Sequence, residues 1–337
     1  MRLIAVITAV VMFLAAPASA AEAASNEASA NAGFEEIRIA NGTEAPLTVG
    51  VWYPTDVAET PQRLGDVVQN VAPRAAVAGR GLPLVVLSHG GGGGYDGHYD
   101  TALALAHAGF VVAALSHAGD THDDQSQVLK PWRRPVQLRR LVSFMLDEWP
   151  HHDQLDGRRV GAFGFSNGGF TVLVAAGGVP DLGKIGPYCE ANPDHDLCRL
   201  LKQAGVDPRV AGGAAPADAW IADPRVKAVV VAAPAFGFAF AGAGLANVHI
   251  PVQLWRGADD RHQPNPWYEE PVRLALPQPP DYQVVPGAGH YDFLPPCGPH
   301  VAAAAPQICA DPPDFDRAAF HARFNADVTR FFQANLR

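Results

Sequence analysis

Apolar and polar positions alternate in blocks along the chain, and each block predicts a strand or a helix. Apolar runs at residues 34–40 and 47–54 are separated by Asn41-Gly42, a turn signal, and predict an opening antiparallel pair of strands. Residues 82–90, LPLVVLSHG, are mostly apolar without alternation, as in a strand that a parallel sheet buries on both faces. Between these strands, up to about Gly81, we expect only a polar, glycine-containing connector.

Helical and strand-like blocks then follow each other to the end of the chain. Helices are expected over residues 99–110, 134–150, 168–178 and 313–336, and the last of them begins near Asp314 or Asp316. Strands are expected over residues 111–117, 158–165, 226–235, 251–257 and 282–289. This alternation predicts an α/β fold, a mostly parallel, doubly wound sheet with helices on both faces.

A long insert, residues 178–223, separates one strand–helix unit from the next strand. It carries glycines, prolines and two cysteines, and it shows little periodicity. At this point of an α/β chain an insert lies over the carboxyl edge of the sheet, where ligands bind. We therefore expect a lid or a pocket wall and not a separate domain.

The first twenty residues have the pattern of a secretory signal. Arg2 is followed by an apolar run over residues 3–16 and by Ala18-Ser19-Ala20, an A-x-A cleavage site. The apolar run is too short to favour the alternative, a membrane anchor. We predict a signal peptide at 1–20, a flexible leader at 21–33 and one domain at 34–337. The protein would then be exported, periplasmic or extracellular, without stable membrane insertion after cleavage.

The four cysteines fit an oxidising compartment. Cys189 and Cys198 are close in sequence, as are Cys297 and Cys309, and these two local pairs are favoured among the three possible pairings. Free buried thiols are the alternative, and the lack of C-x-x-C spacing disfavours metal binding. The net charge of −9 argues against a nucleic-acid partner, because phosphate binding needs a basic surface.

A candidate nucleophile lies in VGAFGFSNGGF, residues 160–170. Gly164, Ser166 and Gly168 form G-x-S-x-G between a predicted strand and a predicted helix. A sharp turn there would strain the serine and expose its hydroxyl, and the flanking positions would pass too close for side chains. An ordinary tight turn is the alternative, and the partners of the serine decide between the two.

A serine nucleophile needs a base and an acid, and in this architecture they follow it along the chain. Of thirteen histidines, His290 follows the last predicted strand on a glycine-rich loop. Asp259 and Asp260 lie on the loop after the preceding strand. Asp260 is preferred because G-x-x-D-x-x-x-P is the usual spacing around the acid in hydrolases with a G-x-S-x-G serine. Here the spacing runs from Gly257 to Pro264. It would orient His290 and stabilise its charged form.

An oxyanion hole needs two backbone N–H groups that face the developing charge. One is expected from Asn167, which follows the nucleophile. The other is expected from the glycine-rich loop at 89–97, from Gly91 or alternatively Gly90. The loop lacks the G-K-[ST] of a phosphate-binding loop. The predicted chemistry requires no metal and no organic cofactor.

Aromatic residues on the surrounding loops predict an apolar acyl or aryl pocket. The candidates for substrate contact are Tyr95, Phe236, Trp267 and Phe293, with Phe238 and Phe240 beside them. His117 and His122 flank a loop that either lines the pocket or lies on the surface. For His151-His152-Asp153, a solvated loop is favoured over a metal site.

These motifs together resemble a known family. LVVLSHGGGG, GFSNGG, GADDRHQP, GAGHYDFL and the tail CADPPDFDRAAFH are similar to those of dienelactone hydrolase-like proteins, close to bacterial relatives of platelet-activating-factor acetylhydrolase. The resemblance spans nearly all of the chain after the signal. It implies the α/β-hydrolase fold, a triad of Ser166, Asp260 and His290, and an oxyanion hole at Gly91 and Asn167.

One departure from the family affects the expected substrate. Dienelactone hydrolases proper use a cysteine nucleophile, whereas this chain has Ser166 and an export signal. We therefore expect a serine esterase acting on small exogenous esters or lipids. A peptidase or an acyltransferase of the same fold, or a binding protein on a hydrolase scaffold, are the alternatives. The oligomeric state is not predicted.

Overall fold

The computed structural model describes residues 31–213 and 215–337 of the 337-residue chain. The expected signal peptide, residues 1–20, and residues 21–30 of the expected leader lie outside the described residues. The first strand, β1 (Asn31–Asn41), begins three residues earlier than expected. Ala32 is fully buried, and its backbone N–H donates to Glu59 Oε1 at 2.7 Å. Residues 31–33 therefore belong to the sheet, which corrects the expected end of the leader.

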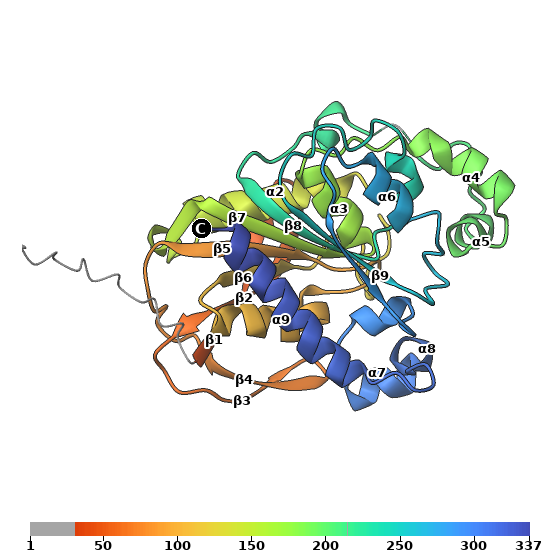
Figure 1. Cartoon of the computed structure of the whole chain (residues 1–337). Coiled ribbons are helices and arrows are strands. Elements are labelled where there is room, and N and C mark those ends of the chain that lie inside the picture. The colour runs from red at the N-terminus through yellow and green to blue at the C-terminus, as the bar shows by residue number, and fades with distance from the viewer. Residues whose placement is uncertain (1–30, 214) are drawn as a thin grey trace, which may run out of the picture.

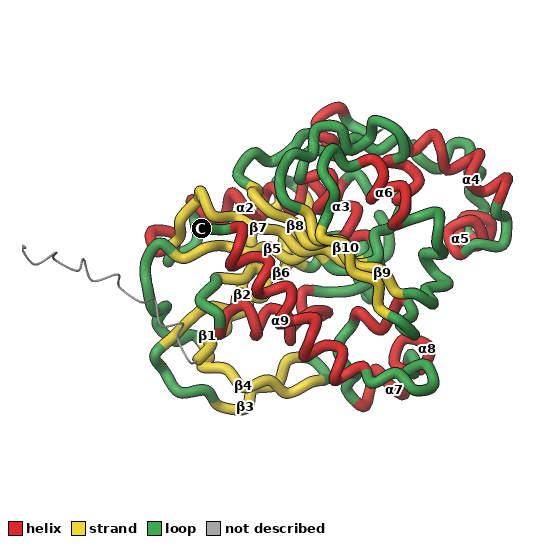
Figure 2. Tube along the Cα trace, viewed as in Figure 1, coloured by secondary structure: helices red, strands yellow, loops and turns green. Residues whose placement is uncertain are grey.

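Within the described residues, ten strands form a sheet of order β10-β9-β8-β7-β5-β6-β2-β1-β4-β3 (Figures 1 and 2). After β1 the strands are β2 (Glu44–Thr55), β3 (Thr60–Leu64), β4 (Val67–Pro73), β5 (Leu82–Ser88), β6 (Val111–Leu115), β7 (Leu155–Phe165), β8 (Val226–Ala232), β9 (Val252–Gly257) and β10 (Asp281–Val285). Strands β5 to β10 are parallel, and β2 is antiparallel to β1 and β6. The expected opening pair and parallel sheet are confirmed.

Helices cover both faces of this sheet (Figure 1). They are α1 (Tyr99–His107), α2 (Arg133–Asp147), α3 (Asn167–Ala175), α4 (Ile185–Ala191), α5 (Asp196–Gln203), α6 (Glu269–Ala275), α7 (Pro299–Ala304), α8 (Pro306–Cys309) and α9 (Arg317–Asn335). Helices α1 and α9 share one hydrophobic core, and α2 and α3 share the other. The helix α9 starts at the second expected position, because the Asp316 side chain accepts a hydrogen bond from the Ala319 N–H at 2.8 Å.

The order of strands around β5 creates the crevice that a ligand site needs. Strand β5 lies between β6 and β7. The chain therefore runs from β5 to β6 on one side of it and then crosses back to β7 on the other side. Helix α1, after β5, and helix α3, after β7, pack on opposite faces. The loops at the carboxyl ends of β5 and β7 therefore diverge, and a crevice opens between them.

The expectation that only a polar connector precedes β5 is wrong. Residues 60–73 form a hairpin, β3 and β4, which extends the sheet beyond β1. Gly65, at φ 56°, makes the turn between the two strands. Polar residues interrupt the alternation of apolar and polar positions in these strands. One of them, Gln69, is buried and accepts a hydrogen bond from the Trp52 indole N–H at 2.8 Å.

The insert at 178–223 contains the helices α4 and α5, more regular structure than its sequence suggested. These helices lie at the same end of the molecule as the C-terminal helices α7 and α8 (Figure 1). Neither α9 nor another helix among the described residues combines the length and the apolar character needed to cross a membrane.

Candidate active site

Ser166 lies in a strained turn between β7 and α3. Its backbone has φ 54° and ψ −116°, a region that non-glycine residues rarely adopt. Its N–H donates to the Ala232 carbonyl oxygen at the end of β8, at 2.9 Å, which holds the turn in place. A Cβ on Gly164 would lie 2.1 Å from the Gly168 carbonyl oxygen, and one on Gly168 would lie 1.8 Å from that of Ser88. Both glycines of the motif are thus required by close backbone approach.

The structure brings Ser166, His290 and Asp260 into one hydrogen-bonded chain. His290 Nε2 lies 3.1 Å from Ser166 Oγ, and His290 Nδ1 lies 2.7 Å from Asp260 Oδ2. All three residues are buried. Because the Asp260 carboxylate accepts, Nδ1 carries the ring proton and Nε2 is left to accept from the serine hydroxyl. This arrangement can remove a proton from Ser166.

Asp260 is held in place by its own loop. Asp260 Oδ1 accepts backbone N–H groups from His262 at 2.8 Å and from Gln263 at 2.7 Å. Burial alone would raise the pKa of Asp260, but the charge and hydrogen bond of His290 and these two N–H groups outweigh it and lower the pKa. Asp259 is exposed, whereas Asp260 is buried and contacts His290.

The glycine-rich loop after β5 lies against the serine turn. A Cβ on Gly90 would lie 3.5 Å from Ser166 Cβ, and one on Gly91 would lie 2.9 Å from Asn167 Nδ2. Gly91 and Asn167, the two residues expected to form an oxyanion hole, both line the cavity that contains Ser166. The structure therefore brings both candidates close to Ser166.

A buried polar network supports this loop from below. Arg134 on α2 forms an ion pair with Asp120 and donates to the His89 carbonyl oxygen. Asp120 in turn accepts the Gly92 N–H at 2.8 Å. His89 Nε2 accepts the His117 N–H at 2.9 Å, so its Nδ1 carries the proton donated to the Gly90 carbonyl oxygen at 2.6 Å. Burial, with a smaller contribution from Arg134, lowers the pKa of His89 and of His117, which keeps both rings neutral.

A cavity of about 550 Å³ opens over Ser166 and His290. Phe236, one of the aromatic candidates, lines it. The insert contributes a wall that the sequence reasoning did not assign to particular residues, since Leu197, Leu200 and Leu201 of α5 also line it. Their i, i+3, i+4 spacing in DLCRLLKQ was the signal that could have identified this amphipathic helix. Phe165, Tyr268 and Tyr291 are further aromatic residues of the lining.

The other aromatic candidates lie elsewhere, which corrects the expectation for them. The Tyr95 hydroxyl donates to Glu36 Oε2 at 2.6 Å, away from the cavity. Trp267 is partly exposed and packs edge-on against Tyr188. Phe293 is fully buried in the core beneath the site, and Phe238 and Phe240 are core residues as well. A loop aromatic close to the site in sequence can point into the core, because burial of its ring is favourable there.

The remaining histidine candidates do not line the cavity either. His117 is buried below the glycine-rich loop, where its Nε2 lies 2.8 Å from Ser88 Oγ. The His122 side chain is largely exposed beside Asp123. His152 Nδ1 donates to the Trp149 carbonyl oxygen at 2.8 Å, and His151 packs against the Trp149 ring.

Two disulfides brace two walls of the cavity. Cys189–Cys198 joins α4 to α5, and Cys297–Cys309 closes a segment that carries α7 and α8. Cys198 lies between the cavity residues Leu197 and Arg199, and Cys309 follows the cavity residue Ile308. Each cross-link thus fixes backbone directly next to the lining.

The insert also contacts the loop of the acid. His262 Nδ1 forms an ion-pair contact with Asp196 at the start of α5. The Tyr188 hydroxyl of α4 donates to the Tyr268 hydroxyl at 2.9 Å. These contacts hold the insert against the segment between β9 and α6 that carries Asp260.

The sheet order, the strained serine after β7 and the His–Asp pair behind it define the α/β-hydrolase fold. A ferulic acid esterase from Streptomyces cinnamoneus is similar over 96% of this chain and 92% of its own, with a TM-score of 0.62 and 18% identity. A dienelactone hydrolase from Anabaena variabilis ATCC 29413 is similar over 90% and 98%, with a TM-score of 0.52 and 15% identity. No protein-family model matches the chain, and no curated protein matches its sequence. The structural likeness shows the fold.

Proposed function

We propose that the protein hydrolyses carboxylic esters through an acyl-enzyme on Ser166. The observation that carries the proposal is the hydrogen-bonded chain from Ser166 Oγ through His290 to Asp260, with contacts of 3.1 and 2.7 Å. A serine hydroxyl is a weak nucleophile unless a positioned base takes its proton. The esterase and hydrolase among the structural neighbours agree with this class of reaction.

In the first half-reaction, Ser166 Oγ attacks the ester carbonyl carbon while His290 Nε2 takes the hydroxyl proton. The backbone N–H groups of Gly91 and Asn167 stabilise the oxyanion that forms. His290 then gives its proton to the leaving alkoxide, and an alcohol departs from the acyl-enzyme. Asp260 stabilises the charged imidazole in between.

In the second half-reaction, a water molecule replaces the alcohol. His290 takes a proton from the water, and the hydroxide attacks the acyl carbon. The tetrahedral intermediate collapses, the carboxylic acid leaves, and the proton returns to Ser166 Oγ. Apart from the ester and this water molecule, the scheme uses side chains and backbone of this chain.

The substrate that best fits the cavity is a small ester with a neutral, apolar acyl or aryl group. Leucines of α5, Phe236, Tyr268 and Ile308 supply an apolar lining. The charged residues in the lining are largely paired, since Asp196 contacts both His262 and Arg199. A ferulate ester belongs in the test set, because one structural neighbour is described as a ferulic acid esterase.

We also propose that the protein is exported. The signal-like residues 1–20 support this, as do two disulfides that an oxidising compartment would maintain. Expression of the full chain with N-terminal sequencing of the mature protein tests it. Cleavage after Ala20 is expected, and an intact N-terminus on protein retained in the cytoplasm would contradict it.

The test of catalysis is hydrolysis of p-nitrophenyl esters, acetate through octanoate, and of methyl ferulate by the wild type and by Ser166→Ala. Ser143→Ala, on α2 and hydrogen-bonded to Arg225, is the matched control and should keep full activity. Loss of activity in Ser166→Ala alone, with labelling of Ser166 by a fluorophosphonate in the wild type, is the expected result. An active Ser166→Ala variant, or a wild type inactive on every ester, would contradict the proposal.

A further inference from the structure

We propose that Arg317 is a positioning residue for the catalytic base, acting through Asp292; this inference rests on the proposed function. His290 begins a short 3-10 turn, His290–Phe293, that follows the loop after β10. Such a turn has few hydrogen bonds of its own to hold a side chain in place. The orientation of the His290 side chain therefore depends on further contacts that hold the turn.

Asp292, two residues after the base, makes one hydrogen bond within the turn and one to helix α9. Its Oδ2 accepts the N–H of Gly289, the residue before His290, at 2.7 Å. Its carbonyl oxygen accepts from His321 Nε2 at 3.0 Å. The turn is thus held on both sides of His290, and both bonds run through one buried aspartate.

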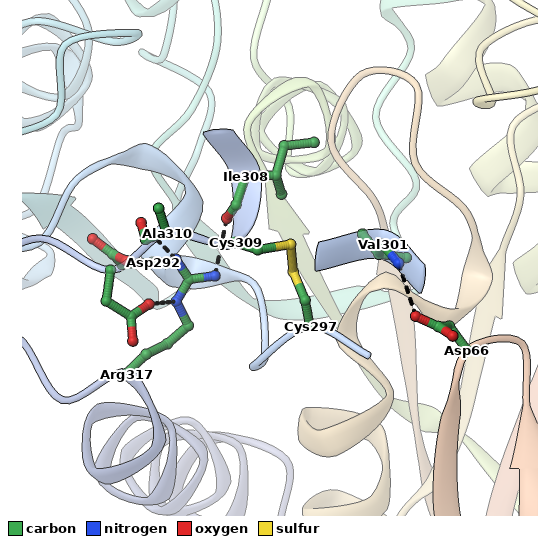
Figure 3. Close-up of a disulfide and its surroundings, with 9 residues drawn as sticks. Asp66, Asp292, Cys297, Val301, Ile308, Cys309, Ala310 and Arg317 are labelled. Atoms are coloured by element: carbon green, nitrogen blue, oxygen red, sulfur yellow. Dashed lines mark hydrogen bonds and ion pairs between the residues drawn. A yellow bond between two sulfur atoms is a disulfide. The ribbon is translucent and has the colours of Figure 1, made fainter. Parts of the chain in front are cut away.

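Arg317 holds Asp292 in turn (Figure 3). Its guanidinium donates to Asp292 Oδ1 at 2.9 Å and to the Ile308 carbonyl oxygen at 3.0 Å, and it forms an ion pair with Asp311 at 2.7 Å. The Arg317 side chain is 2% exposed. One buried, forked side chain therefore links the His290 turn to the segment closed by Cys297–Cys309.

The location of this arginine is unusual for a helix. Arg317 is the first residue of α9, where the helix dipole disfavours a positive charge. A buried charge also costs free energy unless it is paired and hydrogen-bonded. Both penalties are offset by Asp292 and Asp311, so the position of Arg317 is explained by what it connects and not by helix stability.

The linked segment is itself anchored at its far end. The Val301 N–H of α7 donates to Asp66 Oδ2 at 2.9 Å, and Asp66 lies in the turn between β3 and β4 (Figure 3). The disulfide joins the two ends of this segment. The guanidinium therefore ties the His290 turn to a cross-linked segment that is also hydrogen-bonded to the turn between β3 and β4.

The test compares Arg317→Met with Arg323→Met, an exposed arginine on the same helix, in the wild type and in a His290→Ala background. A shift of about 1 Å in a catalytic group costs up to about a hundredfold in rate. We expect Arg317→Met to lower kcat about 10- to 100-fold with KM within about threefold, and Arg317→Lys to recover part of the loss. In the His290→Ala background, Arg317→Met should change the residual rate by less than about threefold, because a positioning residue has no effect once its base is gone.

Asp292→Asn serves as the second variant if Arg317→Met fails to fold, and the same pattern of kcat, KM and coupling is expected. Equal fractional losses in both backgrounds would overturn the proposal, because they would mean that the residue acts on the fold alone. Unchanged kcat in both variants would also overturn it. Wild-type activity in His290→Ala itself would instead show that the proposed base is wrong, so the two failures are distinguishable.

Discussion

Replacing Asp260 by Asn gives the sharpest prediction about the catalytic chain. The two oxygens of Asp260 accept three hydrogen bonds: Oδ2 from His290, and Oδ1 from the backbone N–H groups of His262 and Gln263. An asparagine has only one acceptor oxygen and one NH₂ group. If its oxygen keeps the two backbone bonds, the NH₂ group faces His290 Nδ1.

The NH₂ group can only donate, so His290 must accept at Nδ1 and carry its proton on Nε2. A protonated Nε2 cannot take the proton of Ser166, whose Oγ lies 3.1 Å away. In the Ser-His-Asp triad of a serine protease, which has a different fold, this tautomer change lowers kcat about 10⁴-fold. A loss of that size corresponds to about 5 kcal/mol of transition-state stabilisation. The fold and KM should change little, because the volume and the two backbone bonds are retained.

Steady-state hydrolysis of p-nitrophenyl butyrate at neutral pH measures the effect. Asp259→Asn is the matched control, since Asp259 is the exposed neighbour on the same loop. It should keep kcat within about twofold of the wild type, as a surface substitution does. An Asp260→Asn variant within about tenfold of the wild type would refute the tautomer argument. So would an Asp259→Asn variant with an equal loss.

Two further predictions concern stability. Phe324→Ala should lower the free energy of unfolding by about 3–5 kcal/mol, because the fully buried ring packs against Trp255 and Phe293 between α9 and the sheet. Urea denaturation measures this loss. A loss below about 1 kcal/mol would contradict the packing argument. Glu269 is buried with both carboxylate oxygens unpaired, and burial, with a smaller contribution from Asp260, raises its pKa well above the usual value. The folded state thus keeps a proton that the unfolded state loses above about pH 4, so wild-type stability should fall relative to Glu269→Gln as the pH rises from there. Thermal unfolding at acidic and neutral pH measures the difference, and parallel pH profiles for the two proteins would contradict it.

Much of the fold follows from local patterns. The continuous apolar run of β5 predicted a strand of a parallel sheet, since side chains on both faces of such a strand are buried. The hairpin of β3 and β4 could not be predicted in the same way. Polar residues interrupt both of its strands. Its place in the sheet comes from pairing of β4 with β1, a contact between distant parts of the chain.

In the candidate site, too, one part could be predicted from the sequence and another part could not. Ser166, Asp260 and His290 could be chosen from sequence because each follows a predicted strand, and the carboxyl ends of parallel strands meet at one edge. The residues that line the pocket could not be chosen in this way. Tyr95 and Phe293 are aromatic residues close to the site in sequence, yet one points to Glu36 and the other into the core.

The sequence by itself thus determined the strands other than the β3–β4 hairpin, the strained serine turn and the chain order of Ser166, Asp260 and His290. These depend on periodicity and on glycines that the close backbone approach requires, which are local properties of the chain. Only the tertiary structure decided which side chains line the cavity and how the base is held. Arg317 reaches Asp292 across 25 residues, and α5 reaches the site through His262 and Asp196. Such contacts depend on how separate segments pack, and no local pattern encodes that packing.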